Sequence, residues 1–126
     1  MKVLVCGGRD FSNRKKLFSV LNKIHRSKKI SLLISGAARG ADSLAEEWAN
    51  ENDVEKHIFP ANWKKFGRKA GFIRNQQMLD EGNPDLVVAF TGGVGTDRMV
   101  QAACRQGYEV LTPGNNVKTL FGNKND

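Results

Sequence analysis

The feature that most constrains the fold is a repeated order of segments: a short apolar run, a loop of glycine or small residues, and an amphipathic stretch. Continuous apolar runs of four or five residues are typical of strands that are buried on both faces of a parallel sheet. Apolar residues at offsets of three, four and seven, as at Leu17, Val20, Leu21 and Ile24, are typical of helices. The predicted strands lie at residues 3–6, 30–34, 57–59, 86–90 and 108–111.

Helices are predicted between these strands. The first follows an N-cap at Ser12 or Asn13 and ends near Ser27 or Lys28, and the last is capped by Thr96 and ends at Gly107. Strands that alternate with helices require right-handed crossovers, which predicts one doubly wound α/β fold with a parallel sheet of about five strands in the order 3-2-1-4-5. The other predicted helices cover residues 41–49 and 70–81, residues 61–69 are predicted as an exposed loop, and residues 115–126 as a flexible tail.

Length, charge and cysteine content limit the class of protein. A chain of 126 residues with 40% hydrophobic content is expected to form a single domain over residues 1–126. Its net charge of +7 predicts a negatively charged partner. Only two cysteines are present, which argues against a disulfide framework and so favours the reducing cytoplasm. No apolar run is long enough for a membrane span.

Glycine pairs follow two strands that are neighbours in the predicted order. Gly7 and Gly8 follow the first strand, and Gly92 and Gly93 follow the fourth, at the point where the chain reverses its direction of winding. Ligands of open parallel sheets bind beyond the carboxyl ends of the strands at this point. Backbone N–H groups and the positive end of the next helix bind anions there, so these loops predict a phosphate site.

Two further segments supply polar candidates for this site. In the loop after the second strand, Arg39 is a candidate to bind a phosphate, and Asp42 either caps the next helix or accepts a hydrogen bond from a ribose hydroxyl. Arg74 and Asn75 are expected at the same edge of the sheet. The candidate ligand-binding residues are Gly7, Gly8, Arg9, Asp10, Phe11, Ser35, Gly36, Arg39, Gly40, Asp42, Arg74, Asn75, Gly92, Gly93, Val94, Gly95 and Thr96.

Known motifs of other classes do not fit. Neither the dinucleotide fingerprint G-x-G-x-x-G nor a P-loop with Gly-Lys-Ser or Gly-Lys-Thr is present, which argues against a Walker-type ATPase. His25 and His57 stand apart from other metal ligands, so no metal site is predicted. No cofactor other than a nucleotide or nucleotide-derived ligand is predicted.

Four motifs in order resemble the SLOG superfamily, and most closely its YspA-like branch. They are the sequences at residues 7–11 (Gly-Gly-Arg-Asp-Phe), 36–42 (Gly-Ala-Ala-Arg-Gly-Ala-Asp), 73–76 (Ile-Arg-Asn-Gln) and 92–96 (Gly-Gly-Val-Gly-Thr). The resemblance implies a Rossmann-like domain of bacteria and phages that binds nucleotides or signals derived from them, such as NAD or ADP-ribose, often as a homo-oligomer.

More distant resemblances bear on activity. LOG-type phosphoribohydrolases have a related Pro-Gly-Gly-x-Gly-Thr-x-x-Glu motif and an Arg that matches Arg74, but Thr91 and Met99 stand here in place of the Pro and the catalytic Glu. A thioether cannot accept a proton, so this resemblance makes phosphoribohydrolase activity doubtful. DprA-like proteins of the superfamily bind single-stranded DNA. In this chain Trp63 and Phe66 are candidates to stack on bases, and the neighbouring lysines are candidates to pair with phosphates.

Three hypotheses therefore remain open. The first is a small-molecule binding module, either a sensor or a protein that sequesters a nucleotide signal. The second is a hydrolase that cleaves an N-glycosidic or phosphate bond, with Asp10, Asp42 or Asp97 as the acid or base. The third is a protein that binds nucleic acid through its basic surface.

Overall fold

The sheet has the strand order β3-β2-β1-β4-β5-β6 in the computed structural model, which describes residues 1–113 and 118–119. The first five strands of this order are parallel, and β6 is antiparallel to β5. This confirms the predicted order 3-2-1-4-5 and adds one short edge strand. The strands are β1 (Lys2–Cys6), β2 (Leu32–Ser35), β3 (Glu55–Ile58), β4 (Leu86–Ala89), β5 (Val110–Thr112) and β6 (Lys118–Thr119).

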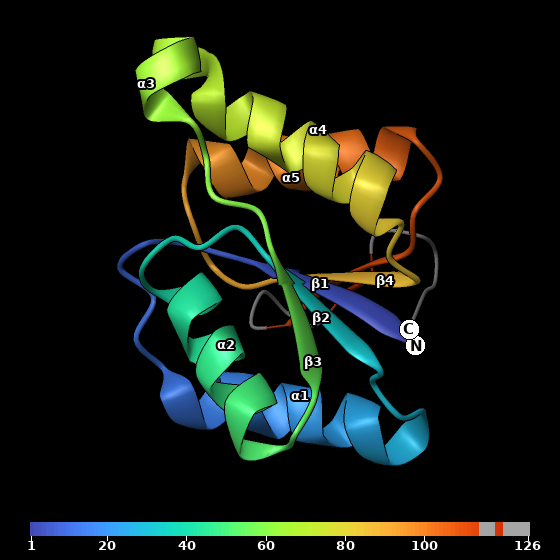
Figure 1. Cartoon of the computed structure of the whole chain (residues 1–126). Helices are drawn as coiled ribbons and strands as arrows, with labels where there is room; N and C mark the ends of the chain where they lie inside the picture. The colour runs from blue at the N-terminus through green and yellow to red at the C-terminus, as the bar shows by residue number, and fades with distance from the viewer. Residues whose placement is uncertain (114–117, 120–126) are drawn as a thin grey trace.

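Helices cover both faces of the sheet, so the molecule has three layers. Figure 1 shows α1 and α2 on one side of the strands and α4 and α5 on the other, with α3 beyond the end of α4. This is a doubly wound, Rossmann-like arrangement, as predicted. The helices are α1 (Arg14–Ser27), α2 (Ala41–Glu51), α3 (Trp63–Phe66), α4 (Ala70–Gly82) and α5 (Val94–Arg105), with a 3-10 turn η1 (Gly67–Lys69) between α3 and α4.

The central strand β1 contributes to a separate hydrophobic core on each face. Successive side chains of a strand point to opposite faces. Val3 and Val5 accordingly pack with residues of α1 and α2, whereas Leu4 and Cys6 pack with residues of α4 and α5. Because β1 lies between β2 and β4, its carboxyl end stands in the middle of the sheet edge, where the chain reverses its direction of winding.

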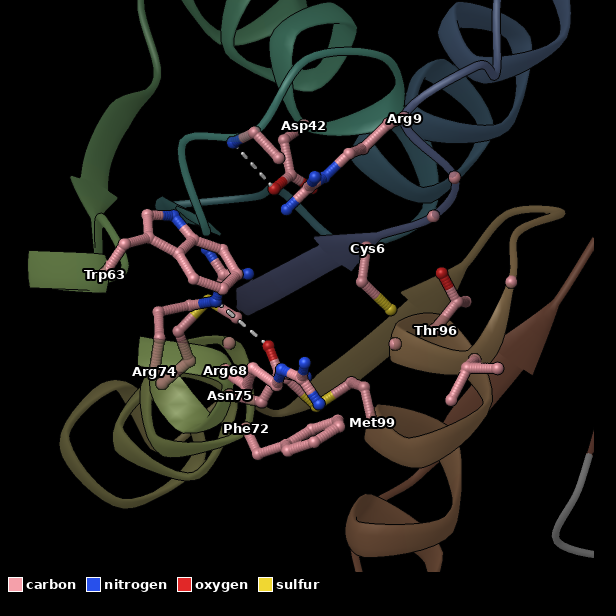
Figure 2. A pocket seen from close by; sticks show the side chains of 18 residues that line it. Cys6, Arg9, Asp42, Trp63, Arg68, Phe72, Arg74, Asn75, Thr96 and Met99 are labelled. Atoms are coloured by element: carbon pink, nitrogen blue, oxygen red, sulfur yellow. Dashed lines mark hydrogen bonds between the residues drawn. The ribbon is translucent and has the colours of Figure 1, made fainter. Parts of the chain in front are cut away.

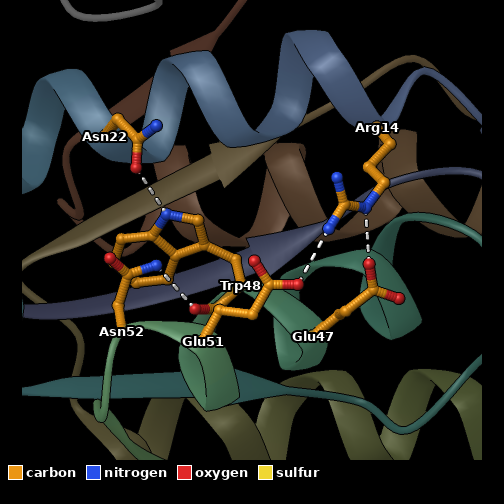
Figure 3. Close-up of polar contacts among 6 residues, drawn as sticks. All are labelled: Arg14, Asn22, Glu47, Trp48, Glu51 and Asn52. Carbon is orange, nitrogen blue, oxygen red and sulfur yellow. Dashed lines mark hydrogen bonds and ion pairs between the residues drawn. The ribbon is translucent and has the colours of Figure 1, made fainter.

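Polar contacts join α1 to α2 around a buried tryptophan (Figure 3). The indole N–H of Trp48 donates to Oδ1 of Asn22 at 2.8 Å, and the ring is fully buried. Arg14 donates to Glu47 at 2.5 Å and to Glu51 at 2.8 Å, but all three side chains are about half exposed. Solvent weakens ion pairs of this kind, so Trp48 contributes more than Arg14 to holding the two helices together.

Several predicted boundaries are wrong. Within the predicted loop 61–69, residues 63–69 form α3 and η1, because the side chain of Asn62 accepts the backbone N–H of Lys65 and caps a short helix. Thr96 is not an N-cap, since α5 begins at Val94 with Gly93 as its cap. Of the two predicted caps of α1, Ser12 and Asn13, the structure confirms Asn13. The predicted tail at 115–126 lies outside the described residues, except for residues 118–119 in β6.

Candidate functional site

A cavity of about 410 Å³ opens at the carboxyl edge of the sheet, between the loop after β1, helix α4 and the first turn of α5. We call it the glycine cavity. Figure 2 shows side chains from these three elements converging on it. Its size falls within the range of small-molecule sites, about 300–1,000 Å³. Ten of the predicted residues line it, namely Gly7, Gly8, Arg9, Asp42, Arg74, Asn75, Gly93, Val94, Gly95 and Thr96.

The first turn of α5 presents bare backbone to this cavity. Gly93 is the N-cap, and no side chain caps the helix. A Cβ atom placed on Gly93 or on Gly95 would meet no atom within 4 Å, so the space beside this turn is open. The first N–H groups of a helix have no partner inside the helix, and the helix dipole adds a partial positive charge there. The turn therefore offers hydrogen-bond donors to an anion.

Other glycines serve loop packing. The N–H of Gly8 donates to the carbonyl of Thr91 at 2.9 Å, which ties the loop after β1 to the loop after β4. A Cβ on Gly92 would lie 2.7 Å from this nitrogen and 2.2 Å from the hydroxyl oxygen of Thr96. Gly40 has a φ of +80°, and a Cβ there would lie 2.2 Å from the carbonyl oxygen of Gly8. Neither Gly40 nor Gly92 lines the cavity, and their role in the structure is to hold three loops together.

Arg74 reaches across the cavity from α4 to the loop after β2. Its Nη1 donates to the carbonyl of Gly36, and its Nε donates to Oδ1 of Asn75 at 3.0 Å. Burial lowers the pKa of the guanidinium, and Arg9 lowers it further, whereas Asp42 raises it. The guanidinium stays charged, because an arginine does not lose its proton in proteins. A Cβ at position 36 would lie 2.6 Å from Nη1 of Arg74, so Gly36 leaves the space in which this guanidinium lies.

Asp42 is a buried carboxylate at the wall of the cavity. It is the second residue of α2, only 6% exposed, and its Oδ2 accepts the N–H of Ala38 at 3.1 Å. It therefore orders the loop before the helix and is not the N-cap, which is Gly40. Burial raises the pKa of Asp42 to about 6, and the N–H of Ala38 and the charge of Arg74 oppose this rise. Burial also raises the pKa of the Cys6 thiol next to it, which keeps this thiol protonated.

Aromatic and cationic side chains from the segment 63–72 complete the cavity. Trp63, Arg68 and Phe72 line it, and Trp63 and Phe72 are 50% and 41% exposed. The guanidinium of Arg9 lies 5.6 Å from the centre of the Trp63 ring, and that of Arg98 lies 4.6 Å from the centre of the Phe72 ring. Trp63, Arg68 and Phe72 are absent from the ligand-binding residues that the sequence predicts, and Trp63 is predicted only as a residue that stacks on bases of single-stranded DNA. The floor contains Met78 and Met99, which are buried.

A second cavity, of about 310 Å³, adjoins the first. We call it the arginine cavity. It is lined by Arg9, Arg39 and Arg74 together with Trp63 and the small residues Gly36, Ala37, Ala38, Pro60 and Ala61. The predicted residues Gly36 and Arg39 thus lie here and not in the glycine cavity.

The remaining predicted residues line neither cavity. Asp10 is exposed and pairs with Arg39 at 3.5 Å. Phe11 packs on Phe90, with the ring centres 5.2 Å apart. Ser35 is buried, and its hydroxyl donates to Glu46 at 3.0 Å. These contacts support the loops around the site.

Within residues 1–113 and 118–119, no three His, Cys, Asp or Glu side chains come together as metal ligands. Over the same residues, every helix is too short or too polar to cross a bilayer. His25 accepts the N–H of Ile30 and packs edge-on against Trp48, and His57 packs on Phe59.

Comparison with known families confirms the predicted resemblance to the SLOG superfamily, over a range that contains the first two of the four motifs. The sequence model of the YspA, cpYpsA-related SLOG family matches residues 1–66. The chain belongs to this SLOG family. A relative of this SLOG chain is the Gene 61 protein of Mycobacterium phage D29, which is 33% identical over 121 residues, or 90% of this chain and 96% of the phage protein.

A solved structure shows the same fold. DNA processing protein A (DprA) from Streptococcus pneumoniae superposes with a TM-score of 0.71 at 20% sequence identity. The superposition covers 90% of the SLOG chain and 50% of the DprA chain, so this chain spans about half of that protein. At this identity the likeness establishes the fold and leaves the ligand open.

Proposed function

We propose that this SLOG chain binds a nucleotide or a nucleotide-derived ligand in the glycine cavity, with a phosphate on the first turn of α5. The observation that carries the proposal is that an uncapped helix start, free of side chains at Gly93 and Gly95, opens into the same cavity as Arg9, Arg68 and Arg74. Main-chain donors, a helix dipole and arginines together favour a phosphate. Phe72 and Trp63 offer apolar faces on which a base can stack.

The residue at the position of the LOG-type catalytic Glu favours binding of the ligand without its cleavage. Met99 is 1% exposed and lines the cavity at the position where the LOG-type motif has its catalytic Glu. Because a thioether cannot transfer a proton, we propose that the protein acts as a sensor or as a protein that sequesters its ligand. Cys6 and Cys104 are free thiols, which fits a reducing compartment such as the cytoplasm.

The test is calorimetric titration of AMP into the wild type, Gly93→Asp and Gly93→Asn. Both side chains fit the open space and are good N-caps, so both variants are expected to fold. The aspartate places a negative charge where the phosphate binds. We expect Gly93→Asp to weaken binding at least about tenfold more than Gly93→Asn, since charge-assisted hydrogen bonds are worth about 1.5–3 kcal/mol each. Equal affinities for the two variants would overturn the proposal.

Incubation separates binding from hydrolysis. We expect AMP to be recovered intact by mass spectrometry after prolonged incubation with the wild type. Release of adenine or adenosine that disappears in Asp42→Asn would instead identify an enzyme that uses this carboxylate.

A second candidate function is the binding of single-stranded nucleic acid. The observation that favours it is the exposure of Trp63, Phe66 and Phe72 within a segment that also contains Lys64, Lys65, Arg68 and Lys69. Aromatic faces and cations arranged in this way stack bases and bind phosphates. Binding of oligothymidylate that weakens steeply with salt, and is unchanged in Gly93→Asp, would establish this function in place of the first.

A further inference from the structure

The two cavities form one elongated site. Four residues, Arg9, Ala38, Trp63 and Arg74, line both of them. The cation–π pair of Arg9 and Trp63 stands where the cavities meet, and Figure 2 shows the Arg9 side chain extending toward the Trp63 ring. A ligand longer than a mononucleotide can therefore lie across this pair, with one part in each cavity.

The ionisable side chains that line the arginine cavity are all cationic. They are Arg9, Arg39 and Arg74. Asp10, which pairs with Arg39 at 3.5 Å, does not line the cavity, and both of these side chains are largely exposed. The pair is therefore weak, and Arg39 can exchange Asp10 for a phosphate at little cost. An arginine binds a phosphate through two parallel N–H donors.

Three backbone groups in the loop of this cavity already have hydrogen-bond partners. The N–H of Ala38 donates to Asp42, the N–H of Ala37 donates to Ser35, and the carbonyl of Gly36 accepts from Arg74. The groups that this cavity offers to an anion are chiefly arginine side chains, whereas the glycine cavity offers the main chain of α5. The elongated site has two anion-binding positions of different chemistry, one in each cavity.

We propose that the arginine cavity is a subsite for the second phosphate of a ligand made of two nucleotide units. This rests on the proposed function, because the first phosphate is the one held by α5. In a ligand whose phosphates are separated by a nucleoside, that nucleoside lies in the glycine cavity. The second base lies in the arginine cavity, against Trp63, Pro60 and Ala61.

The experiment compares AMP, the 5′-phosphorylated dinucleotide pApA and NAD⁺ by calorimetry at physiological salt. pApA separates its phosphates by a nucleoside, whereas NAD⁺ joins two nucleosides through a pyrophosphate, so the pair of probes distinguishes the two linkages. We expect at least one two-unit probe to bind about ten- to a hundredfold more tightly than AMP, the gain that one charge-assisted contact supplies.

Arg39→Ala tests the subsite itself. We expect this variant to lose most of the gain in affinity for the two-unit probe and to bind AMP like the wild type. Arg26→Ala, which removes one exposed charge from α1, is the control for net charge and should change neither affinity.

The outcomes separate the two proposals. If AMP binds as tightly as both two-unit probes, or if Arg39→Ala affects AMP and the two-unit probe alike, the subsite is refuted and the proposed function stands. If none of the probes binds, or if binding is indifferent to Gly93→Asp, the proposed function fails and the subsite fails with it.

Discussion

Replacement of Asp42 by asparagine measures the free-energy cost of a buried carboxylate at the wall of the site. Burial raises the pKa of Asp42 from its ordinary value of 3.8 to about 6. A group whose pKa is higher in the folded state binds its proton more tightly there than in the unfolded chain. Its stabilising contribution is therefore fully present below about pH 4 and is lost as the pH rises through about 6.

The size of this effect follows from the two pKa values. Each pKa unit corresponds to about 1.4 kcal/mol, so ionisation of Asp42 costs the folded protein about 3 kcal/mol by pH 8. Asparagine has nearly the same shape, and its Oδ1 can still accept the N–H of Ala38. We expect Asp42→Asn to gain up to about 3 kcal/mol relative to the wild type between pH 4 and pH 8.

The assay is urea unfolding of both proteins at several pH values. Plotting the difference in free energy of unfolding against pH removes the contribution of groups that the two proteins share. Arg74→Met provides a second check, because Arg74 lowers the pKa of Asp42 and its loss should move the transition to higher pH. A flat difference curve, or a wild type that gains on Asp42→Asn as the pH rises, would refute this reasoning.

Three further predictions concern the packing that positions the site. Gly40→Ala should cost at least about 2 kcal/mol in urea unfolding, because the position has a φ of +80° and a Cβ would meet the carbonyl of Gly8. Gly93→Ala is the matched control, and its free energy of unfolding should fall by less than about 1 kcal/mol because a Cβ there meets no atom. Comparable losses of stability in the two variants would contradict the distinction between glycines required for packing and the open glycine of the site. Trp48→Ala should cost about 3–5 kcal/mol, since the ring is fully buried, and a loss below 1 kcal/mol would show that it is not a core residue. Asn22→Ala should cost about 1–3 kcal/mol by leaving the indole N–H without its partner, and a stability equal to the wild type in thermal unfolding would disprove the importance of that bond.

The parts of the fold that could be predicted from sequence are those with strong local patterns. The apolar runs that form β1 and β4 are buried on both faces, and Asn13 is a side-chain cap of a standard type. The sequence predicts β3 at 57–59, but the strand lies at Glu55–Ile58. The boundaries differ because β3 is an edge strand with mainly exposed side chains and so has little apolar pattern. β6 has only two residues and gives no such pattern.

In the candidate site too, the residues with a strong sequence pattern could be predicted and the others could not. The glycine loops of β1 and β4 could be located at one edge because parallel topology places the carboxyl ends of strands together. Arg68 and Phe72 could not be assigned to that edge, since the direction of their side chains depends on how α4 packs against α5 and on the short helix α3. That helix is four residues long, too short to show a helical period, and the cap at Asn62 was its only sequence signal.

The most direct test of the central claim, that the first turn of α5 holds a phosphate, is a titration of ¹⁵N-labelled protein with AMP followed by amide chemical shifts. We predict that the largest changes fall on Gly93, Gly95 and Thr96, which line the cavity at the first turn of α5, with smaller changes at Arg9 and Asn75. Shifts confined to Lys64, Lys65 and Lys69, with the α5 glycines unmoved at saturation, would contradict the claim.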